Sequence, residues 1–248
     1  FGKRTHLKIK KENLGLQAKI VLPSLALGCS TFVMQASESV ISVCFNSSLL
    51  QYGGDIAVGA MTILTSVMQF AMLPLQGLGQ GAQPIISYNY GAGNVERVKA
   101  AFKLLLKASL CYSILLWLFV MFFPQAFAAM FTSDASLMEY TKTALRIYMA
   151  CLLLFGIQMA CQMTFTSLGK AKASILVAVM RKFILLIPLI YIMPTLFTSN
   201  QTMAVYMAEP VADFLAVSFT AILFTFQFKK VIAQMTTSSS SKKEHVTI

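Results

Sequence analysis

The sequence predicts an all-α polytopic membrane protein, a bundle of six transmembrane helices. Of its 248 residues, 57% are hydrophobic and only 12% are charged, and the mean hydropathy is +0.71. An average soluble domain carries about 25% charged residues. Because a soluble fold cannot bury this much apolar surface, lipid must cover part of the chain.

Six apolar runs are each long enough to cross a hydrocarbon core of about 30 Å. Some of them are longer than a straight crossing needs, which implies tilted or kinked helices. Prolines lie within several runs and are tolerated in membrane helices where neighbouring groups satisfy the freed backbone. The six runs cover residues 18–49, 56–88, 103–123, 143–168, 174–194 and 202–228.

The basic residues alternate with these runs. Of the 20 lysines and arginines, all except Lys142 and Arg146 lie in the N-terminal tail, around the second-to-third and fourth-to-fifth connections, or after the sixth run. Such alternation predicts an even number of crossings with both termini in the cytoplasm. We expect residues 1–17 to be a basic cytoplasmic segment, 18–229 the six-helix bundle, and 230–248 a disordered cytoplasmic tail rich in Ser and Lys.

Four of the runs carry a polar stripe. Polar groups that face lipid unsatisfied cost several kcal/mol each. These stripes therefore face inward, either to hydrogen-bond neighbouring helices or to line a wet cavity. At about 100° per residue the members of each stripe share a face. The stripes are Thr31, Gln35, Glu38, Ser42 and Asn46; Thr62, Ser66, Gln69, Gln76 and Gln80; Gln158, Gln162 and Thr166; and Glu209, Asp213, Thr220 and Gln227.

Ionisable residues inside the runs are the sharpest functional candidates. A charged side chain near the bilayer centre costs about 2.5–3.5 kcal/mol on insertion scales. Glu38 lies in the middle of the first run. Its carboxylate either binds a proton, a sodium ion or a cationic substrate, or is a structural group whose hydrogen bonds are satisfied. Glu209 and Asp213 share a face at i, i+4 and are further candidates, although Glu209 precedes Pro210, where a structural carboxylate accepts bonds at a helix break. Arg181 either snorkels to the interface or pairs with an acid of the sixth run.

Several functional classes are excluded. The five cysteines all lie in apolar runs without a CxxC pair, and His6 and His245 lie in the tails, so we predict no metal site. No Gly-Lys-Ser/Thr follows the glycine-rich segment, so ATP-driven transport has no support. No nucleophile–base–acid set indicates an enzyme. The net charge of +11 is clustered between apolar runs, which indicates membrane orientation rather than nucleic-acid binding.

Several glycines and prolines lie in the second run. Gly77 and Gly81 form a GxxxG pair, which lets helix backbones approach closely in lipid. Pro74 and Pro84 flank this pair. We therefore expect these four residues to be packing or hinge positions.

The stretch "MQFAMLPLQGLGQGAQPIISYNYGAGNVERVKAAFK", residues 68–103, resembles the glycine-rich second helix and following loop of the multidrug and toxic compound extrusion (MATE) family. The segments "FGIQMACQMTFTSLGKAKASILVAVMRKFILLIPLIYIMP" (155–194) and "MAEPVADFLAV" (207–217) extend the resemblance. So does "LPSLALGCSTFVMQASESVISVCFNSSLLQYGGD" (22–55), which is similar to the first helix of that family's C-terminal half.

The resemblance implies one lobe of a twelve-helix transporter of the cell (plasma or inner) membrane. The partner would be the missing N-terminal six-helix lobe, and the sequence, which begins with Phe, would be a fragment of a longer chain. The family exports cationic or amphiphilic drugs and toxic compounds in exchange for H⁺ or Na⁺, without another cofactor. Glu38 would then be the coupling carboxylate, with Gln35, Gln69, Gln158 and Gln162 lining the substrate path.

One departure from the family pattern concerns coupling. Some sodium-coupled relatives carry an acidic residue earlier in this first helix, where the present chain has Thr31, and its acid, Glu38, comes two turns later. In other members the key carboxylate belongs to the first lobe. Two rival interpretations stay open. One is a lipid-linked oligosaccharide flippase of related architecture, although its cavity should hold basic residues mid-membrane. The other is a non-transporting membrane interaction module or truncated remnant.

Overall fold

The computed structural model describes residues 18–244, and side-chain environments within 36–170 and 172–237. It divides into two units, Phe1–Val43 and Cys44–Ile248. Of the first unit only the helical stretch 18–43 is described. Throughout 18–244 the regular secondary structure is helical, which confirms the predicted all-α class. The predicted basic segment 1–17 lies outside the described residues.

Helix α1, Ala18–Gly91, is interrupted at Gly54, where φ is 66° and ψ is −162°. A side chain would be strained at this positive φ, which glycine adopts without penalty. The break divides α1 into two limbs, 18–53 and 55–91, and it lies between the first two predicted runs. The turn between these spans is therefore at Gly54. The second limb continues as helix through Pro74 and Pro84, whose hinge role stays a prediction.

Four of the described helices are long and apolar enough to cross a membrane, and the bent pair formed by α4 and α5, with 44° between its parts, provides one more span. Because the break at Gly54 divides the α1 span into two limbs, these five spans become six crossing segments, as predicted. After α1 the elements are α2 (Val95–Phe122), α3 (Pro124–Ala129), α4 (Ala135–Tyr148), η2 (Leu152–Leu154), α5 (Phe155–Ser167), α6 (Ala171–Val179), η3 (Met180–Leu186), α7 (Ile187–Leu196), η4 (Thr198–Asn200) and α8 (Gln201–Glu244).

Two helix ends differ from the predicted boundaries. Helix α2 begins at Val95 instead of 103, because Val98 is buried against Ile86 of α1. Helix α8 continues to Glu244, so residues 230–244 are helical rather than disordered as predicted. Val231 and Met235 explain the extension, because both are buried in the same cluster as Val98. Residues 245–248 lie outside the described part of the chain.

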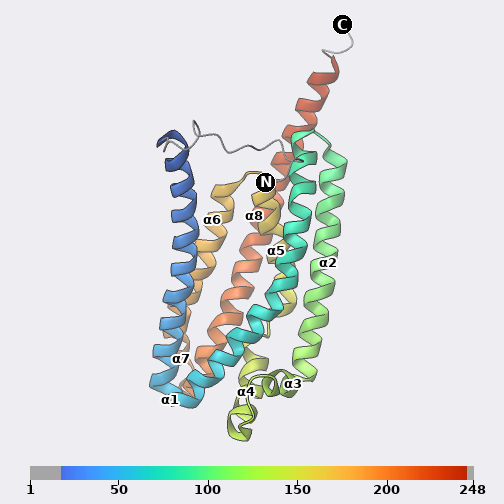
Figure 1. The fold of residues 1–248 in the computed structure, drawn as a ribbon. Helices are drawn as coiled ribbons and strands as arrows, with labels where there is room; N and C mark the ends of the chain where they lie inside the picture. Colours follow the sequence, from blue (N-terminus) through green and yellow to red (C-terminus); the bar gives the residue numbers. More distant parts are fainter. Residues whose placement is uncertain (1–17, 245–248) are drawn as a thin grey trace, which may run out of the picture. The chain divides into compact units, whose positions relative to one another are not determined.

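Helix α5 packs between α2 and α8, and this contact forms the core of the second unit (Figure 1). Backbones approach most closely at Gly156, where an added Cβ would stand 2.6 Å from the carbonyl oxygen of Ser109 on α2. Further along, Phe102 of α2 stacks on Phe224 of α8 with ring centroids 4.6 Å apart, and Phe165 of α5 meets Phe224 edge-on at 5.2 Å. Close backbones and stacked rings together hold the three helices.

The fifth span is continuous but irregular, because the seven residues of η3, between α6 and α7, form a π-helix. Pro188 follows at the start of α7. Proline has no N–H to donate, and its ring crowds the carbonyl four residues earlier. A π-turn widens the helix at such a place, and π-turns occur frequently at functional sites. The span therefore accommodates Pro188 by widening directly before it.

Candidate functional site

The most concentrated charge in the described part of the chain is a cluster of Arg181, Glu209 and Asp213, which we call the acid–arginine cluster. Arg181 lies in η3, and both acids lie on α8. The Nε of Arg181 donates to Oδ1 of Asp213 at 2.6 Å, and its Nη2 donates to Oε1 of Glu209 at 2.9 Å. One guanidinium thus bridges two carboxylates that stand one turn apart on the same helix face.

The cluster is shielded from solvent. The side chains of Arg181, Glu209 and Asp213 are 19%, 7% and 4% exposed. The guanidinium carbon also lies 5.0 Å from the centroid of the Phe155 ring on α5, within the distance at which a cation is attracted to an aromatic face. The fifth span, α5 and α8 are therefore joined at one point by charge and by ring contact.

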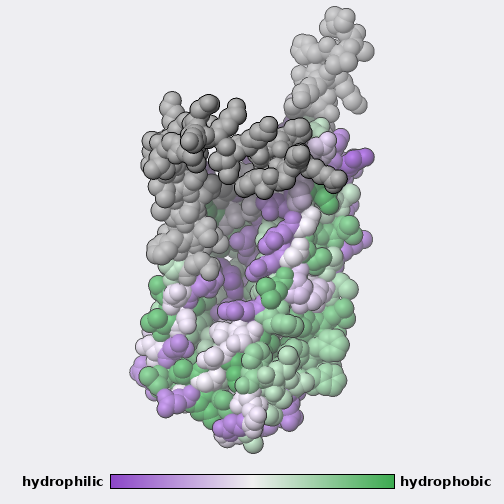
Figure 2. Space-filling view, in the orientation of Figure 1, coloured by the Kyte–Doolittle hydropathy of each residue, from purple (hydrophilic) through white to green (hydrophobic). Residues whose placement is uncertain are grey.

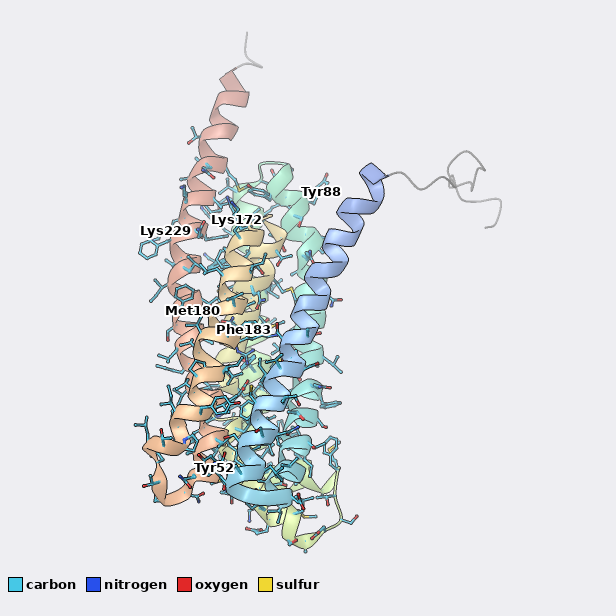
Figure 3. The ribbon with its side chains drawn as sticks, turned by 90° about the vertical axis from the view of Figure 1, so that its left-hand side faces the viewer. Tyr52, Tyr88, Lys172, Met180, Phe183 and Lys229 are labelled. Atoms are coloured by element: carbon cyan, nitrogen blue, oxygen red, sulfur yellow. The ribbon has the colours of Figure 1, made fainter. Side chains whose placement is uncertain are left out.

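Local structure aims Arg181 at these acids. Met180 and Phe183 of the same π-helix are labelled in Figure 3, which shows η3 alongside α8 midway along the bundle. On α8, Pro210 follows Glu209 directly and removes one backbone donor from that turn. Pairing was one of two outcomes open for Arg181 from the sequence, and the structure shows the pair. Nothing in the sequence singled out Phe155, whose role depends on how α5 packs.

The start of α8 is hydrogen-bonded to α1 on both sides of the break at Gly54. Tyr206, which is fully buried, donates its hydroxyl to the carbonyl oxygen of Ala57 at 2.7 Å. Thr202 donates to the carbonyl oxygen of Tyr52 at 2.8 Å. The sequence alone does not identify these residues, because a tyrosine in an apolar run carries no signal of its partner. The bonds fix the Gly54 turn against α8.

The second limb of α1 presents a polar face outward. Gln69, Gln76 and Gln80 of the predicted stripe are all exposed in the lobe. Figure 2 shows hydrophilic residues along this limb beside the mostly hydrophobic flank of α2. Within the described residues no helix packs on Gly77 or Gly81, because a Cβ on either would meet no atom within 4 Å. Their packing role stays a prediction. Those glycines belong to the same open face.

The remaining predicted site residues are dispersed. Gln158 is turned into the bundle, 4% exposed, and its Oε1 has no hydrogen-bond partner among the described atoms. Gln162, one turn later on α5, is half-buried. Glu38 lies on the first limb of α1, in the unit 1–43, and the side chain of Gln35 is outside the described ones. No group of metal-binding residues occurs in the part of the chain that the structure describes.

These features define a polytopic helical membrane protein that keeps ionised groups inside its bundle and exposes a polar face on one helix. The chain belongs to the MatE family, whose model matches residues 30–192. Two of the curated relatives carry the name "Multidrug export protein MepA". The one from Staphylococcus aureus (strain N315) is 26% identical over 192 residues, 77% of this chain and 41% of the relative. The one from Staphylococcus haemolyticus is 24% identical over 215 residues, 84% of this chain and 47% of the relative.

The chain thus spans less than half the length of these relatives. Among solved structures, it is similar to a MOP superfamily transporter from Pyrococcus furiosus, with a TM-score of 0.79 at 19% identity, over 92% of this chain and 51% of that one. It is also similar to a multidrug resistance MATE family transporter in an outward-facing conformation, with a TM-score of 0.78 at 20% identity over 92% and 51%. For an inward-facing conformation the TM-score is 0.79 at 19% identity over 96% and 54%. These likenesses establish the fold of one lobe.

Proposed function

We propose that this chain is the C-terminal lobe of a secondary antiporter that exports cationic or amphiphilic compounds in exchange for H⁺ or Na⁺. The observation that carries the proposal is the family membership of a lobe in which the second limb of α1 exposes Gln69, Gln76 and Gln80. Polar side chains at membrane depth are tolerated where they line a cavity or meet protein. The relatives named as multidrug export proteins support the same class of cargo.

A second lobe is the partner that this face requires. The open surface around Gly77 and Gly81 accepts a closely approaching helix, and the matched relatives are about twice as long as the matched region. The lobe resembles outward-facing and inward-facing structures equally well, at TM-scores of 0.78 and 0.79. This supports a mechanism in which each lobe keeps its fold and the two rock against each other. The bilayer is the other partner, and the basic ends favour cytoplasmic termini in the cell membrane.

Within this lobe we assign coupling to Glu38 rather than to the acids of α8. Glu209 and Asp213 are already held by Arg181, which neutralises charge that an exported cation or coupling ion would otherwise use. Protonation of Glu38, or Na⁺ binding there, would shift the equilibrium between outward-open and inward-open states. Gln35 and Gln69 then contribute to the path, with Gln158 and Gln162 nearer the bundle interior. Apart from the coupling ion no cofactor is needed.

The test is energised efflux of a fluorescent cationic dye from cells that lack their own pumps and express the full reading frame. We expect efflux to collapse when the proton or sodium gradient is dissipated, and Glu38→Gln to lose coupling. Glu96→Gln is the matched control, because Glu96 is an exposed acid at the start of α2. A Glu38→Gln protein that exports normally with unchanged ion dependence would refute the assignment. No efflux from confirmed membrane protein would refute multidrug export.

A further inference from the structure

Basic side chains gather where α2 and α8 meet, at the end of the bundle that also holds the α1–α2 and α5–α6 turns. Lys103 and Lys107 of α2 and Lys229 and Lys230 of α8 are all exposed. Among the described residues none of the four has an ion pair, and the acid at this end, Glu96, is paired with Lys99 at 2.9 Å. Lys172, Lys229 and Tyr88 lie toward this end in Figure 3, and Tyr52 lies at the other.

Ring stacking fixes the register between the two helices. Phe102 stacks on Phe224 and also lies 5.2 Å from Phe228. Lys103 directly follows Phe102, and Lys229 directly follows Phe228, so the two lysines stand at nearly the same level. We call the line of contact marked by these four residues, Phe102, Lys103, Phe228 and Lys229, the α2–α8 seam.

The two lysines also share a side of the seam. Each stands about 100° around its helix from the stacked phenylalanine. Helices α2 and α8 run antiparallel, and both pack on α5 (Figure 1). In antiparallel helices a step of about 100° past the facing rings turns both side chains to the same side of the seam. Because both lysines are exposed while the rings pack toward Phe165 of α5, that side faces away from α5. Their ammonium groups converge on one strip of outer surface.

Below the lysines the same strip is apolar. Ile114 of α2 and Ile222 of α8, three and two turns deeper than Lys103 and Lys229, are 41% and 60% exposed. After Lys230 the exposed positions of α8 include Gln234, Thr236 and Thr237. This change from apolar to basic to polar places the lysines at the depth of lipid headgroups. A ligand here meets ammonium groups at one end and hydrocarbon side chains at the other.

We propose that the α2–α8 seam binds an anionic phospholipid, with its phosphate between Lys103 and Lys229 and its acyl chains along Ile114 and Ile222. Basic pockets between membrane helices bind anionic headgroups, and each lysine near the surface strengthens such binding. The headgroup of a zwitterionic lipid carries its own cation, which these unpaired lysines would repel. The interaction stabilises the packing of α8 on α2 beside the stacked rings.

The experiment is a lipid titration of the full-length protein in neutral detergent, followed by native mass spectrometry. Phosphatidylglycerol and phosphatidylcholine with the same acyl chains are the probes. We expect the doubly substituted Lys103→Gln, Lys229→Gln protein to bind phosphatidylglycerol about twenty-five-fold more weakly, which corresponds to about five-fold from each lysine. Its binding of phosphatidylcholine should not change, and its melting temperature without added lipid should match the wild type.

The matched control is Lys172→Gln with Lys230→Gln, which removes the same charge from exposed positions at the same end of the bundle. This control should keep its preference for phosphatidylglycerol. An equal loss in both double variants would overturn the proposal, because it would show diffuse attraction rather than a site. A millimolar concentration of glycerol 3-phosphate that displaces the lipid would show a site for soluble phosphate and would also overturn it.

Discussion

Replacing Arg181 by Met should destabilise the lobe strongly. The substitution keeps an unbranched apolar stem but removes the guanidinium that lies over Phe155. It leaves Glu209 and Asp213, 7% and 4% exposed, without their counter-charge. Removing one partner of a buried ion pair costs about 3–5 kcal/mol. For a domain of this size 1 kcal/mol shifts the melting temperature by about 2–4 °C. We therefore expect a fall of about 6–20 °C.

Thermal unfolding in detergent, followed by size-exclusion chromatography with fluorescence detection, measures the change. Two further variants separate charge from packing. Arg181→Lys keeps the charge but cannot make both bonds with the geometry of a guanidinium, so its melting temperature should fall between those of wild type and Arg181→Met. Adding Glu209→Gln and Asp213→Asn to Arg181→Met removes the uncompensated charge and should recover at least half of the loss.

The reasoning would be refuted by an Arg181→Met protein that melts within about 2 °C of wild type. It would also fail if neutralising both acids brought no recovery, since the cost would then arise from packing of the side chain and not from buried charge. After either result, Glu209 and Asp213 would again be candidates for the coupling carboxylate.

Three more changes test local features. Gly156→Ala should cost about 1–3 kcal/mol in thermal unfolding, because its Cβ would stand 2.6 Å from the Ser109 carbonyl oxygen. Tyr206→Phe should cost about 0.5–1.5 kcal/mol in the same assay, because it deletes the 2.7 Å bond to the carbonyl of Ala57. Hydrogen bonds from the side chain and backbone of residue 136 hold the pKa of Asp134 below its usual value. The stability that this cap gives α4 should be present above the usual pKa and lost as pH falls below it, measured by amide exchange at the start of α4.

Two of these three tests have a control on the same fold. Gly91→Ala adds a methyl group at the end of α1 where the described structure has open space, so the melting temperature should not change. Glu139→Gln alters an exposed acid of α4 beyond its first turn, so amide exchange at the start of α4 should keep its pH dependence. A Gly91→Ala protein that melts as low as Gly156→Ala would contradict the close-packing argument. Unchanged exchange at low pH in the wild type would contradict the cap.

The number of spans and the fold class followed from the sequence because both depend on one-dimensional properties. An apolar run of sufficient length must be helical in a membrane, whatever it packs against. For the same reason the break at Gly54 falls between the first two predicted runs. Ends were less predictable, since the extension of α8 through Val231 and Met235 depends on a groove supplied by α2.

The sequence by itself determined that Glu209 and Asp213 share a helix face, because spacing of four residues fixes that angle on any helix. Only the tertiary structure decided their partner: Arg181 reaches them because a π-turn and the packing of the fifth span on α8 bring residues 28 and 32 positions apart within 2.9 and 2.6 Å. The glycines show the same division. The GxxxG spacing identified Gly77 and Gly81, but close packing within the lobe occurs at Gly156, because contact depends on which surface another helix covers and not on the spacing of small residues.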